Sequence, residues 1–327
     1  MTGLRTFYVG AVEGSRVGLH ALIEAGLAPD LVVTLPPSAA ARHSDFADIG
    51  ALARERGIPV HETTRINDGA TLDALRELQP DLGLVIGWSQ ICGPAFRAVP
   101  RLGTIGFHPS PLPRLRGRAV IPWTIILGEQ RSGSSLFWID EGTDTGPIVL
   151  QERFELDLRE TAATLYARHT DALARMLPRA VRLAAEGRAP AQAQDHAAAS
   201  ICARRRPEDG ELDWSRSADE IDRLVRALGG PYPPAHTWTA RGRLNILAAE
   251  PVRDEPRFIG FPGQVQARTD GAFTVLCGDG SALLITAWDG ERPAMHERLG
   301  APRPNGSVMP NRAWTDPVRT LEKASHA

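Results

Sequence analysis

The sequence of 327 residues contains little cysteine, and the cysteines it has follow no regular pattern. Cys92, Cys202 and Cys277 lie far apart, form no Cys-x-x-Cys pair and are odd in number. A zinc site needs closely spaced ligands, and a disulfide framework needs an even set of thiols. We therefore expect no metal site and three thiols that are buried or idle.

Long apolar runs and an excess of one charge are also missing. No run approaches the roughly 20 apolar residues that a membrane-spanning helix needs, and no signal peptide precedes the first predicted strand. The 37 Lys and Arg residues nearly balance the 39 Asp and Glu residues, so the net charge of −2 provides no basic field for nucleic acid. These absences predict a soluble, cytoplasmic protein without a membrane partner.

Three common catalytic and cofactor motifs are absent as well. The glycines of GAVEGS at 10–15 do not form the G-x-G-x-x-G pattern of dinucleotide-binding proteins. The chain contains neither the phosphate-binding G-x-x-x-x-G-K-[ST] sequence nor the G-x-S-x-G elbow of serine hydrolases. We interpret 10–15 as a simple tight turn that contains Gly14 and Ser15.

The first part of the sequence does show a regular alternation of strands and helices. Strands are predicted at 7–10 and 30–35 with a helix at 17–25 between them, and this unit repeats up to a strand that ends at His108. A long amphipathic helix follows, and its apolar face is predicted to carry Leu165, His169, Leu173, Leu177 and Val181. The alternation predicts a Rossmann-like, doubly wound, mostly parallel sheet over residues 1–203.

The pattern changes in the second part of the chain. Residues 188–210 are small, polar and irregular, which is typical of a linker, and 217–229 predict a short helix. Short strands separated by glycine-containing turns are then predicted at 236–240, 244–250, 263–268, 272–277 and 282–287. They indicate a smaller antiparallel, OB-like β-barrel over 204–300, followed by a loosely ordered tail at 301–327.

Ligands of an open α/β sheet bind beyond the carboxyl ends of its strands. Segments 86–91 (IGWSQI), 106–110 (GFHPS) and 138–146 (WIDEGTDTG) are expected at that edge. Three prolines follow His108 closely and enforce a rigid loop there. A histidine that is oriented by a carboxylate such as Asp144 can donate to a developing oxyanion or move protons in acyl transfer. The alternative, a structural histidine and a turn aspartate, predicts packing roles only.

Two stretches, 103–129 (GTIGFHPSPLPRLRGRAVIPWTIILGE) and 137–152 (FWIDEGTDTGPIVLQE), resemble the formyltransferases that use 10-formyltetrahydrofolate. In that family a strand ends in N-x-H, runs into a Ser-Leu-Leu-Pro-like loop and an R-G pair, and later reaches D-x-G. The positions here that match are His108, Ser110, Leu112-Pro113, Arg116-Gly117 and Asp144-Thr145-Gly146. Residues 204–238 are similar to the start of the family's smaller C-terminal domain, so the resemblance covers residues 5–290.

The resemblance implies direct formyl transfer to an amine, with 10-formyltetrahydrofolate as co-substrate and no metal. His108 is expected to stabilise the tetrahedral oxyanion, and Asp144 to orient His108 and help remove the amine proton. Ser110 is a third candidate catalytic residue. The folate pterin is expected against the backbone of two segments that contain Ile86, Gly87, Trp88, Ser89, Gln90, Ile91, Ile139, Asp140, Glu141, Gly142 and Thr143.

One position departs from the family pattern. The family's asparagine, which is read as a donor to the formyl oxygen, is replaced here by Gly106. Losing one oxyanion donor can cost about 10²–10³ in rate. A water, the substrate, or a side chain such as Ser110 or Gln90 is expected to take its place, or activity is low.

The amine acceptor is not determined by these motifs. Methionyl-tRNA formyltransferases of this family carry a basic loop and a basic linker, whereas the loop after the strand at 30–35 has only Arg42 and His43 as cations. Residues 43–49 (HSDFADI), 86–91 and 106–113 look more like the branch that formylates nucleotide-linked amino sugars. An amino sugar is therefore the expected acceptor. The alternatives are methionyl-tRNA, another small amine or hydroxylamine, and a folate- or nucleotide-binding protein that has lost catalysis; a homodimer is compatible with each.

Overall fold

The computed structural model describes residues 3–42, 45–253 and 258–300, which form two compact units. The first unit contains the chain up to Ile121, Gln130–Leu158 and Ala163–Arg204. The second contains Pro122–Glu129, Arg159–Ala162 and the chain from Arg205 onward. Two short segments from the predicted first domain therefore belong to the second unit. The predicted tail at 301–327 lies outside the described residues.

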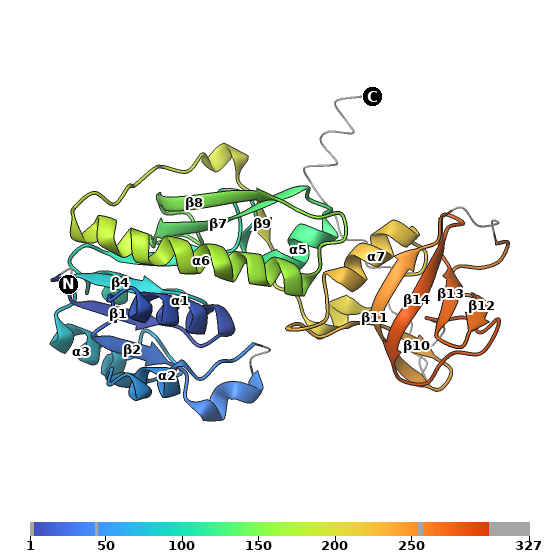
Figure 1. Cartoon of the computed structure of the whole chain (residues 1–327), viewed down its shortest axis with the longest axis horizontal. Coiled ribbons are helices and arrows are strands. Elements are labelled where there is room, and N and C mark those ends of the chain that lie inside the picture. Colours follow the sequence, from blue (N-terminus) through green and yellow to red (C-terminus); the bar gives the residue numbers. More distant parts are fainter. Residues whose placement is uncertain (1–2, 43–44, 254–257, 301–327) are drawn as a thin grey trace. The chain divides into compact units, whose positions relative to one another are not determined.

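The first unit is built on a seven-stranded sheet (Figure 1). Its strands, in spatial order, are β3 (Val60–Glu62), β2 (Leu31–Thr34), β1 (Thr6–Val9), β4 (Leu82–Val85), β5 (Thr104–His108), β7 (Arg131–Trp138) and β8 (Ile148–Glu155). The pairs from β3 to β5 are parallel, and β7 and β8 are antiparallel to their neighbours. The predicted mostly parallel, doubly wound sheet is confirmed.

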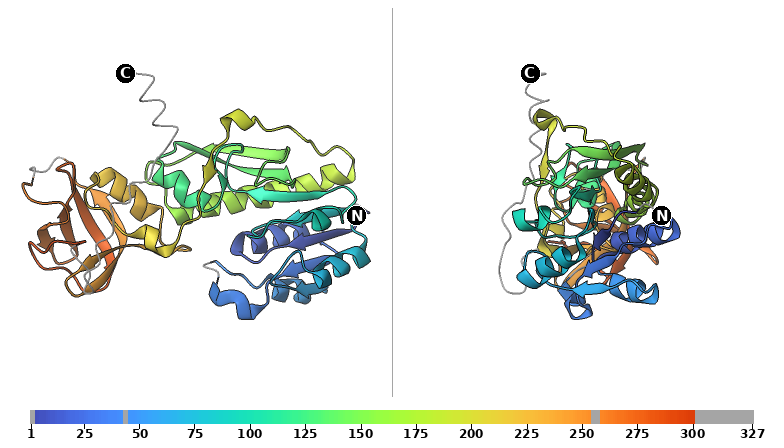
Figure 2. Two further views of the ribbon diagram at one scale, coloured as in Figure 1. Left: turned by 180° about the vertical axis from the view of Figure 1, so that it is seen from behind. Right: turned by 90° about the vertical axis from the view of Figure 1, so that its left-hand side faces the viewer.

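Helices cover both faces of this sheet (Figures 1 and 2). They are α1 (Glu13–Glu24), α2 (Ile49–Glu55), α3 (Gly69–Leu78), α4 (Pro94–Arg97) and the long α6 (Ala162–Ala185). Helix α5 (Val120–Ile126) precedes β7, and most of it belongs to the second unit. Asp48 and Asp68 cap α2 and α3 by accepting the amide N–H groups of Ala51 and Thr71. The five residues predicted on the apolar face of the long helix are all buried.

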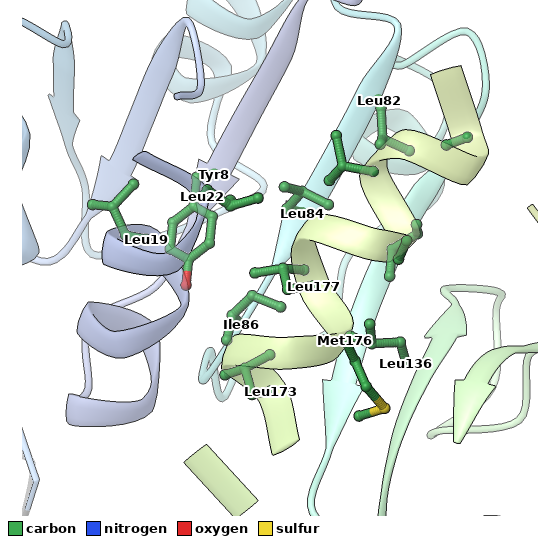
Figure 3. Packing of buried hydrophobic residues seen from close by; sticks show 14 of the residues in the cluster. Tyr8, Leu19, Leu22, Leu82, Leu84, Ile86, Leu136, Leu173, Met176 and Leu177 are labelled. Carbon is green, nitrogen blue, oxygen red and sulfur yellow. The ribbon is translucent and has the colours of Figure 1, made fainter. Parts of the chain in front are cut away.

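Strand β1 shows why helices must pack on both faces of the sheet. Tyr8 belongs to a cluster with Leu19 of α1 and Leu173 of α6 (Figure 3), whereas Phe7 and Val9 belong to a second cluster with residues of α3 and α4. Successive side chains of a strand point to opposite faces, so a strand that is apolar throughout is stable only between two helical layers.

The first helix begins earlier than the sequence predicts. Gly14 and Ser15, interpreted as turn residues, lie in the first turn of α1. The Ser15 hydroxyl accepts the amide N–H groups of Ala11 and Val12 and donates to the carbonyl of Ile86 at 2.6 Å. The Ser15 side chain therefore accepts the backbone N–H groups just before α1. It also joins the end of β1 to the end of β4, the two strands between which the order of the sheet reverses direction.

The second unit is an antiparallel sheet of five strands, as predicted. Its spatial order is β10 (Ala235–Thr239), β11 (Gly242–Pro251), β14 (Ala282–Asp289), β13 (Ala272–Leu276) and β12 (Val265–Thr269), with helix α7 (Ala218–Arg226) packed on β11. Residues 296–300 connect the two edges, since Val265 N–H donates to the Glu297 carbonyl and Gly300 N–H to the Trp238 carbonyl, both at 2.9 Å. The sheet thereby closes into a small barrel.

The predicted linker at 188–210 is more structured than its composition indicates. It contains the short strand β9 (Ile201–Cys202), which pairs in parallel with β6 (Arg116–Gly117) of the loop after β5. Small and polar residues carry no periodic hydrophobic signal, so the sequence could not reveal this pairing.

Among the described residues, no helix is both long enough and apolar enough to cross a membrane. The same residues contain no group of three or more His, Cys, Asp or Glu side chains that could hold a metal ion. All three cysteines are free thiols, and burial raises the pKa of Cys92 and Cys277 to about 12. These two thiols are therefore neutral and poor nucleophiles at pH 7.

Candidate active site

Three segments of the first unit meet around the end of strand β5. The Arg118 guanidinium, in the loop after β6, donates to the Ser89 carbonyl at 2.6 Å and so joins 106–118 to 86–91. A Cβ atom built on Gly106 would lie 3.1 Å from Ile139 Cγ1, which brings the loop after β7 onto the same strand. The three segments expected at one edge of the sheet are thus neighbours.

His108 ends β5 with a side chain that is 6% exposed, held between two oxygen atoms. Its Nε2 lies 2.7 Å from the Leu115 carbonyl oxygen, and its Nδ1 lies 3.5 Å from Asp144 Oδ2. A carbonyl oxygen only accepts hydrogen bonds, so the short contact places a hydrogen on Nε2. The ring therefore has a carboxylate on one side and a donor N–H on the other, which is the arrangement that acyl transfer needs.

Asp144 is fixed in place from two directions. Its backbone adopts the left-handed conformation with φ of 55°, which turns the side chain toward the loop after β5. Oδ2 accepts the Gly117 N–H at 2.8 Å, and the Asp144 carbonyl accepts from Gln194 Nε2 at 3.0 Å. Both the carboxylate and its backbone are thus held facing His108.

Asp140 has a different role, because its carboxylate closes the turn in which it lies. It accepts the Gly142 N–H at 3.1 Å and the Thr145 hydroxyl at 2.6 Å. Of the two aspartates in this acidic loop, only Asp144 faces the histidine.

The loop that carries Leu115 is shaped by hydroxyl groups. Ser110, fully buried, donates to the Arg114 carbonyl at 2.7 Å, while the Ser135 hydroxyl donates to the Ser110 carbonyl at 2.7 Å. Leu115 has a positive φ of 56°, which directs its carbonyl at His108. The Ser110 hydrogen is therefore used inside the loop, and a catalytic part for Ser110 stays a prediction.

The space beside Gly106 is apolar. A Cβ atom at this position would lie 3.0 Å from Phe137 Cζ and 3.1 Å from Ile139 Cγ1, both tighter than ordinary contact. Gln90, one of the suggested replacement donors, donates to the Thr64 carbonyl at 2.7 Å and accepts the Ile66 N–H at 2.9 Å. The Ser110 hydrogen is thus used inside the loop, whereas Gln90 is held toward residues 64–66 but needs only one of its two amide hydrogens for its bond to Thr64.

The two segments predicted to hold folate have mostly exposed residues. Ile86 is buried, Trp88, Ile139 and Asp140 are partly exposed, and the remaining members are exposed, namely Gly87, Ser89, Gln90, Ile91, Glu141, Gly142 and Thr143. Trp88 and Ile139 pack against the same hydrophobic cluster beneath the site. Most residues of both segments are therefore accessible to solvent, while Trp88 and Ile139 anchor the segments to the cluster.

Sequence reasoning missed Gln194 and Ser200. Both lie in the presumed linker, yet Gln194 is 6% exposed and accepts from the buried guanidinium of Arg116 at 2.7 Å. Ser200 accepts the Leu115 N–H at 2.9 Å. The sequence signal was weak, because two glutamines, Gln192 and Gln194, and a serine in an alanine-rich stretch are not enough to assign a role.

His169 on α6 lies on the helix side of strand β7. Its Nδ1 lies 2.8 Å from the Ser134 hydroxyl, and its Nε2 is buried with no hydrogen-bond partner. Burial, with a smaller contribution from His108, lowers the pKa of His169 to about 3. It is therefore a neutral structural histidine, in keeping with its predicted place on the apolar helix face.

Known protein families match both parts of the chain. A family model described as formyl transferase matches residues 30–181, and one described as formyl transferase, C-terminal domain, matches residues 204–298. The methionyl-tRNA formyltransferase of Anaeromyxobacter dehalogenans is 35% identical over 285 residues, which is 86% of this chain and 91% of the relative. The methionyl-tRNA formyltransferase of Syntrophus aciditrophicus is 34% identical over 286 residues, 87% and 91% of the two chains.

Among solved structures, an N-formyltransferase from Helicobacter canadensis in complex with folinic acid and dTDP-3-aminofucose is similar in fold. Its TM-score is 0.65 at 17% identity, over 86% of this chain and 99% of that protein. At this identity the likeness extends to the fold alone.

Proposed function

The chain belongs to the formyl transferase family, and we propose that it transfers the formyl group of 10-formyltetrahydrofolate to the primary amine of a small acceptor. The acceptor that we expect is a nucleotide-linked amino sugar. The chain is a one-carbon transferase.

The reaction requires an amine nitrogen to attack the formyl carbon. A new C–N bond forms, the formyl oxygen becomes an oxyanion, and the bond from carbon to N10 of the folate then breaks. The amine proton passes through the Asp144 carboxylate and ends on N10 of the departing tetrahydrofolate. Asp144 fits this role because Gly117 and Gln194 fix it while it remains 20% exposed.

His108 fits the role of oxyanion stabiliser. In the free protein its Nε2–H donates to the neutral carbonyl of Leu115. An oxyanion is a stronger acceptor than a neutral carbonyl, so the developing charge can draw this hydrogen bond to itself. A contact that strengthens only as charge develops favours the transition state over bound substrate.

The charge of the second unit is the observation that supports a small acceptor. Between residues 205 and 300 the chain has fifteen Asp and Glu residues and twelve Lys and Arg residues. Proteins that hold tRNA neutralise its phosphates with clustered Lys and Arg side chains. The segment between β2 and α2 adds little, because η1 (Pro37–Arg42) contains a single cation. A second unit with more acidic than basic residues, and a loop in the first unit with a single cation in η1, each suit a small acceptor better than a polyanion.

Methionyl-tRNA is the second candidate, because the two sequence relatives described above are named methionyl-tRNA formyltransferase. The two candidates differ in what must hold the acceptor. A tRNA needs many phosphate contacts and strong salt dependence, whereas an amino sugar needs only the site at the end of β5.

The test is a panel of acceptors with 10-formyltetrahydrofolate. Amino sugars linked to dTDP, UDP and GDP, a simple hydroxylamine and methionyl initiator tRNA are compared by tetrahydrofolate release and by mass spectrometry of the formylated product. We expect the highest kcat/KM with an amino sugar. A higher kcat/KM with the tRNA would replace this proposal with the second candidate. Folate binding without turnover on any acceptor would favour a binding protein that has lost catalysis.

A further inference from the structure

Residues 194–200, which follow α6, support the two residues whose oxygen atoms flank the His108 ring. One is Oδ2 of Asp144 on the Nδ1 side, and the other is the carbonyl oxygen of Leu115 on the Nε2 side. Each of these two residues is tied to a different polar side chain of residues 194–200. All of the groups concerned lie in the first unit.

Gln194 holds the Asp144 side. Its Nε2 donates to the Asp144 carbonyl at 3.0 Å and to the Gly146 carbonyl at 2.6 Å, so both donors of the amide are used on the turn that carries the aspartate. Its Oε1 accepts from Arg116 Nε at 3.2 Å and from Nη2 at 2.7 Å. The amide thus connects the aspartate turn to strand β6.

Arg116 makes this connection rigid. Arg116 is 4% exposed as a residue, and Gln194 Oε1 and His196 Nδ1 are the hydrogen-bond partners of its guanidinium among the described residues. A buried cation keeps hold of the acceptors that it has, because water cannot replace them. Gln194 is therefore fixed at its oxygen end while its nitrogen end supports Asp144.

Ser200 holds the Leu115 side. Its hydroxyl accepts the Leu115 N–H at 2.9 Å, and its carbonyl accepts the Arg116 N–H at 2.8 Å. The pairing of β9 with β6 continues this contact along the chain. Leu115 has a positive φ, a conformation that a leucine seldom adopts without such support. Ser200 therefore stabilises the backbone that directs the Leu115 carbonyl at His108.

We propose that Gln194 and Ser200 are positioning residues for formyl transfer, which set the two hydrogen-bonding partners of the His108 ring. The proposal rests on the proposed function for its kinetic consequence, and the placement of the ring can be tested without it. Neither side chain touches a reacting atom; each acts through Asp144 or Leu115. Displacing either partner lets the ring turn away from the formyl oxygen.

The experiment compares five variants of the full chain. Gln194→Met removes all three functions of the amide at similar volume, and Gln194→Glu keeps an acceptor for Arg116 but loses the donors for Asp144 and Gly146. Ser200→Ala removes the hydroxyl, and Ser200→Thr retains it. Gln192→Met is the matched control, because Gln192 lies two residues away and its side chain is exposed.

We expect Gln194→Met, Gln194→Glu and Ser200→Ala to lower kcat by about 10- to 100-fold, the scale of a small displacement of catalytic groups. The KM for 10-formyltetrahydrofolate should change little, and Ser200→Thr and Gln192→Met should keep the kcat of the original protein. Equal kcat in all five variants would overturn the proposal, as would losses that match the fraction of unfolded protein measured by circular dichroism.

A second readout needs no substrate. In protein labelled with ¹⁵N-histidine, the ring signals of His108, identified by their absence in His108→Gln, report whether Nε2–H stays bonded to a carbonyl. We expect these signals to shift and broaden in Gln194→Met and Ser200→Ala and to stay unchanged in Gln192→Met. Unchanged signals in folded Gln194→Met and Ser200→Ala would refute the placement. If the original protein turned over no acceptor, the proposed function would fail while this readout still decided the placement.

Discussion

Replacing Gly106 with asparagine tests how the site manages without the family's side chain. The two explanations of the missing asparagine predict different changes in kcat. If the site is merely impaired, asparagine restores an oxyanion donor and kcat rises by up to about 10²-fold. If the site has been rebuilt around glycine, the new side chain enters occupied space and gains nothing.

The structure favours the second outcome. The Cβ atom alone would lie 3.0 Å from Phe137 Cζ and 3.1 Å from Ile139 Cγ1, before the amide group is placed. Gly106 does not have a positive φ, so the conflict is with side chains and not with the backbone. Overpacking of this kind costs about 1–3 kcal/mol. Phe137 is 5% exposed and packs with Leu112 and Ile148, so it has little room to move.

The assay measures two quantities on Gly106→Asn, Phe137→Leu and the double variant. Urea denaturation yields the free energy of unfolding, and formyl transfer yields kcat per folded molecule. We expect Gly106→Asn to lose about 1–3 kcal/mol of stability, and to lower kcat per folded molecule because the asparagine side chain crowds the site. The double variant should recover part of the loss, a coupling of about 0.5 kcal/mol or more between neighbours. Gly271→Asn, where a Cβ atom meets nothing within 4 Å, controls for the asparagine itself.

A tenfold or greater rise in kcat for Gly106→Asn alone would refute the rebuilt site. Full stability of Gly106→Asn with no coupling to Phe137→Leu would refute the packing argument separately. Lost stability with unchanged kcat per folded molecule would instead indicate that glycine serves the strand and not the chemistry.

Three further predictions concern other parts of the molecule. His108→Ala and Asp144→Asn should each lower kcat by orders of magnitude while the circular dichroism spectrum is kept; equal activity would remove that residue from the mechanism, and lost folding would indicate a packing role. Burial lowers the pKa of His169 to about 3, so between about pH 6.5 and about pH 3 the unfolded chain binds a proton at this residue that the folded chain does not. The free energy of unfolding should therefore drop by about 1.4 kcal/mol for each pH unit in that range. His169→Gln should lack this drop when denaturation is compared at pH 5 and pH 7. Raising salt from about 50 to about 200 mM should lower kcat/KM for an amino sugar by far less than the roughly 10³-fold loss of proteins with many phosphate contacts, and a loss of that size would favour tRNA.

Much of the fold was predictable because its signals are local. Strand β1 is apolar at successive positions, as a strand covered on both faces must be, and the apolar face of α6 follows the 3.6-residue period of a helix. The start of α1 was predicted wrongly for the same reason. Ser15 reads locally as a turn residue, and its role depends on the Ile86 carbonyl, which lies 71 residues away along the chain.

The order of motifs in the sequence determined which family the chain resembles, where its sheet and barrel lie, and that His108 and Asp144 belong to one site. Tertiary structure alone decided what surrounds them. The bonds from Gln194 to Asp144 and from Leu115 to Ser200 span 50 and 85 residues, and Phe137 fills the space beside Gly106 from the neighbouring strand. A hydrogen bond or a packing contact between distant residues depends on the path of the backbone between them, and neither partner carries a local pattern that announces the other.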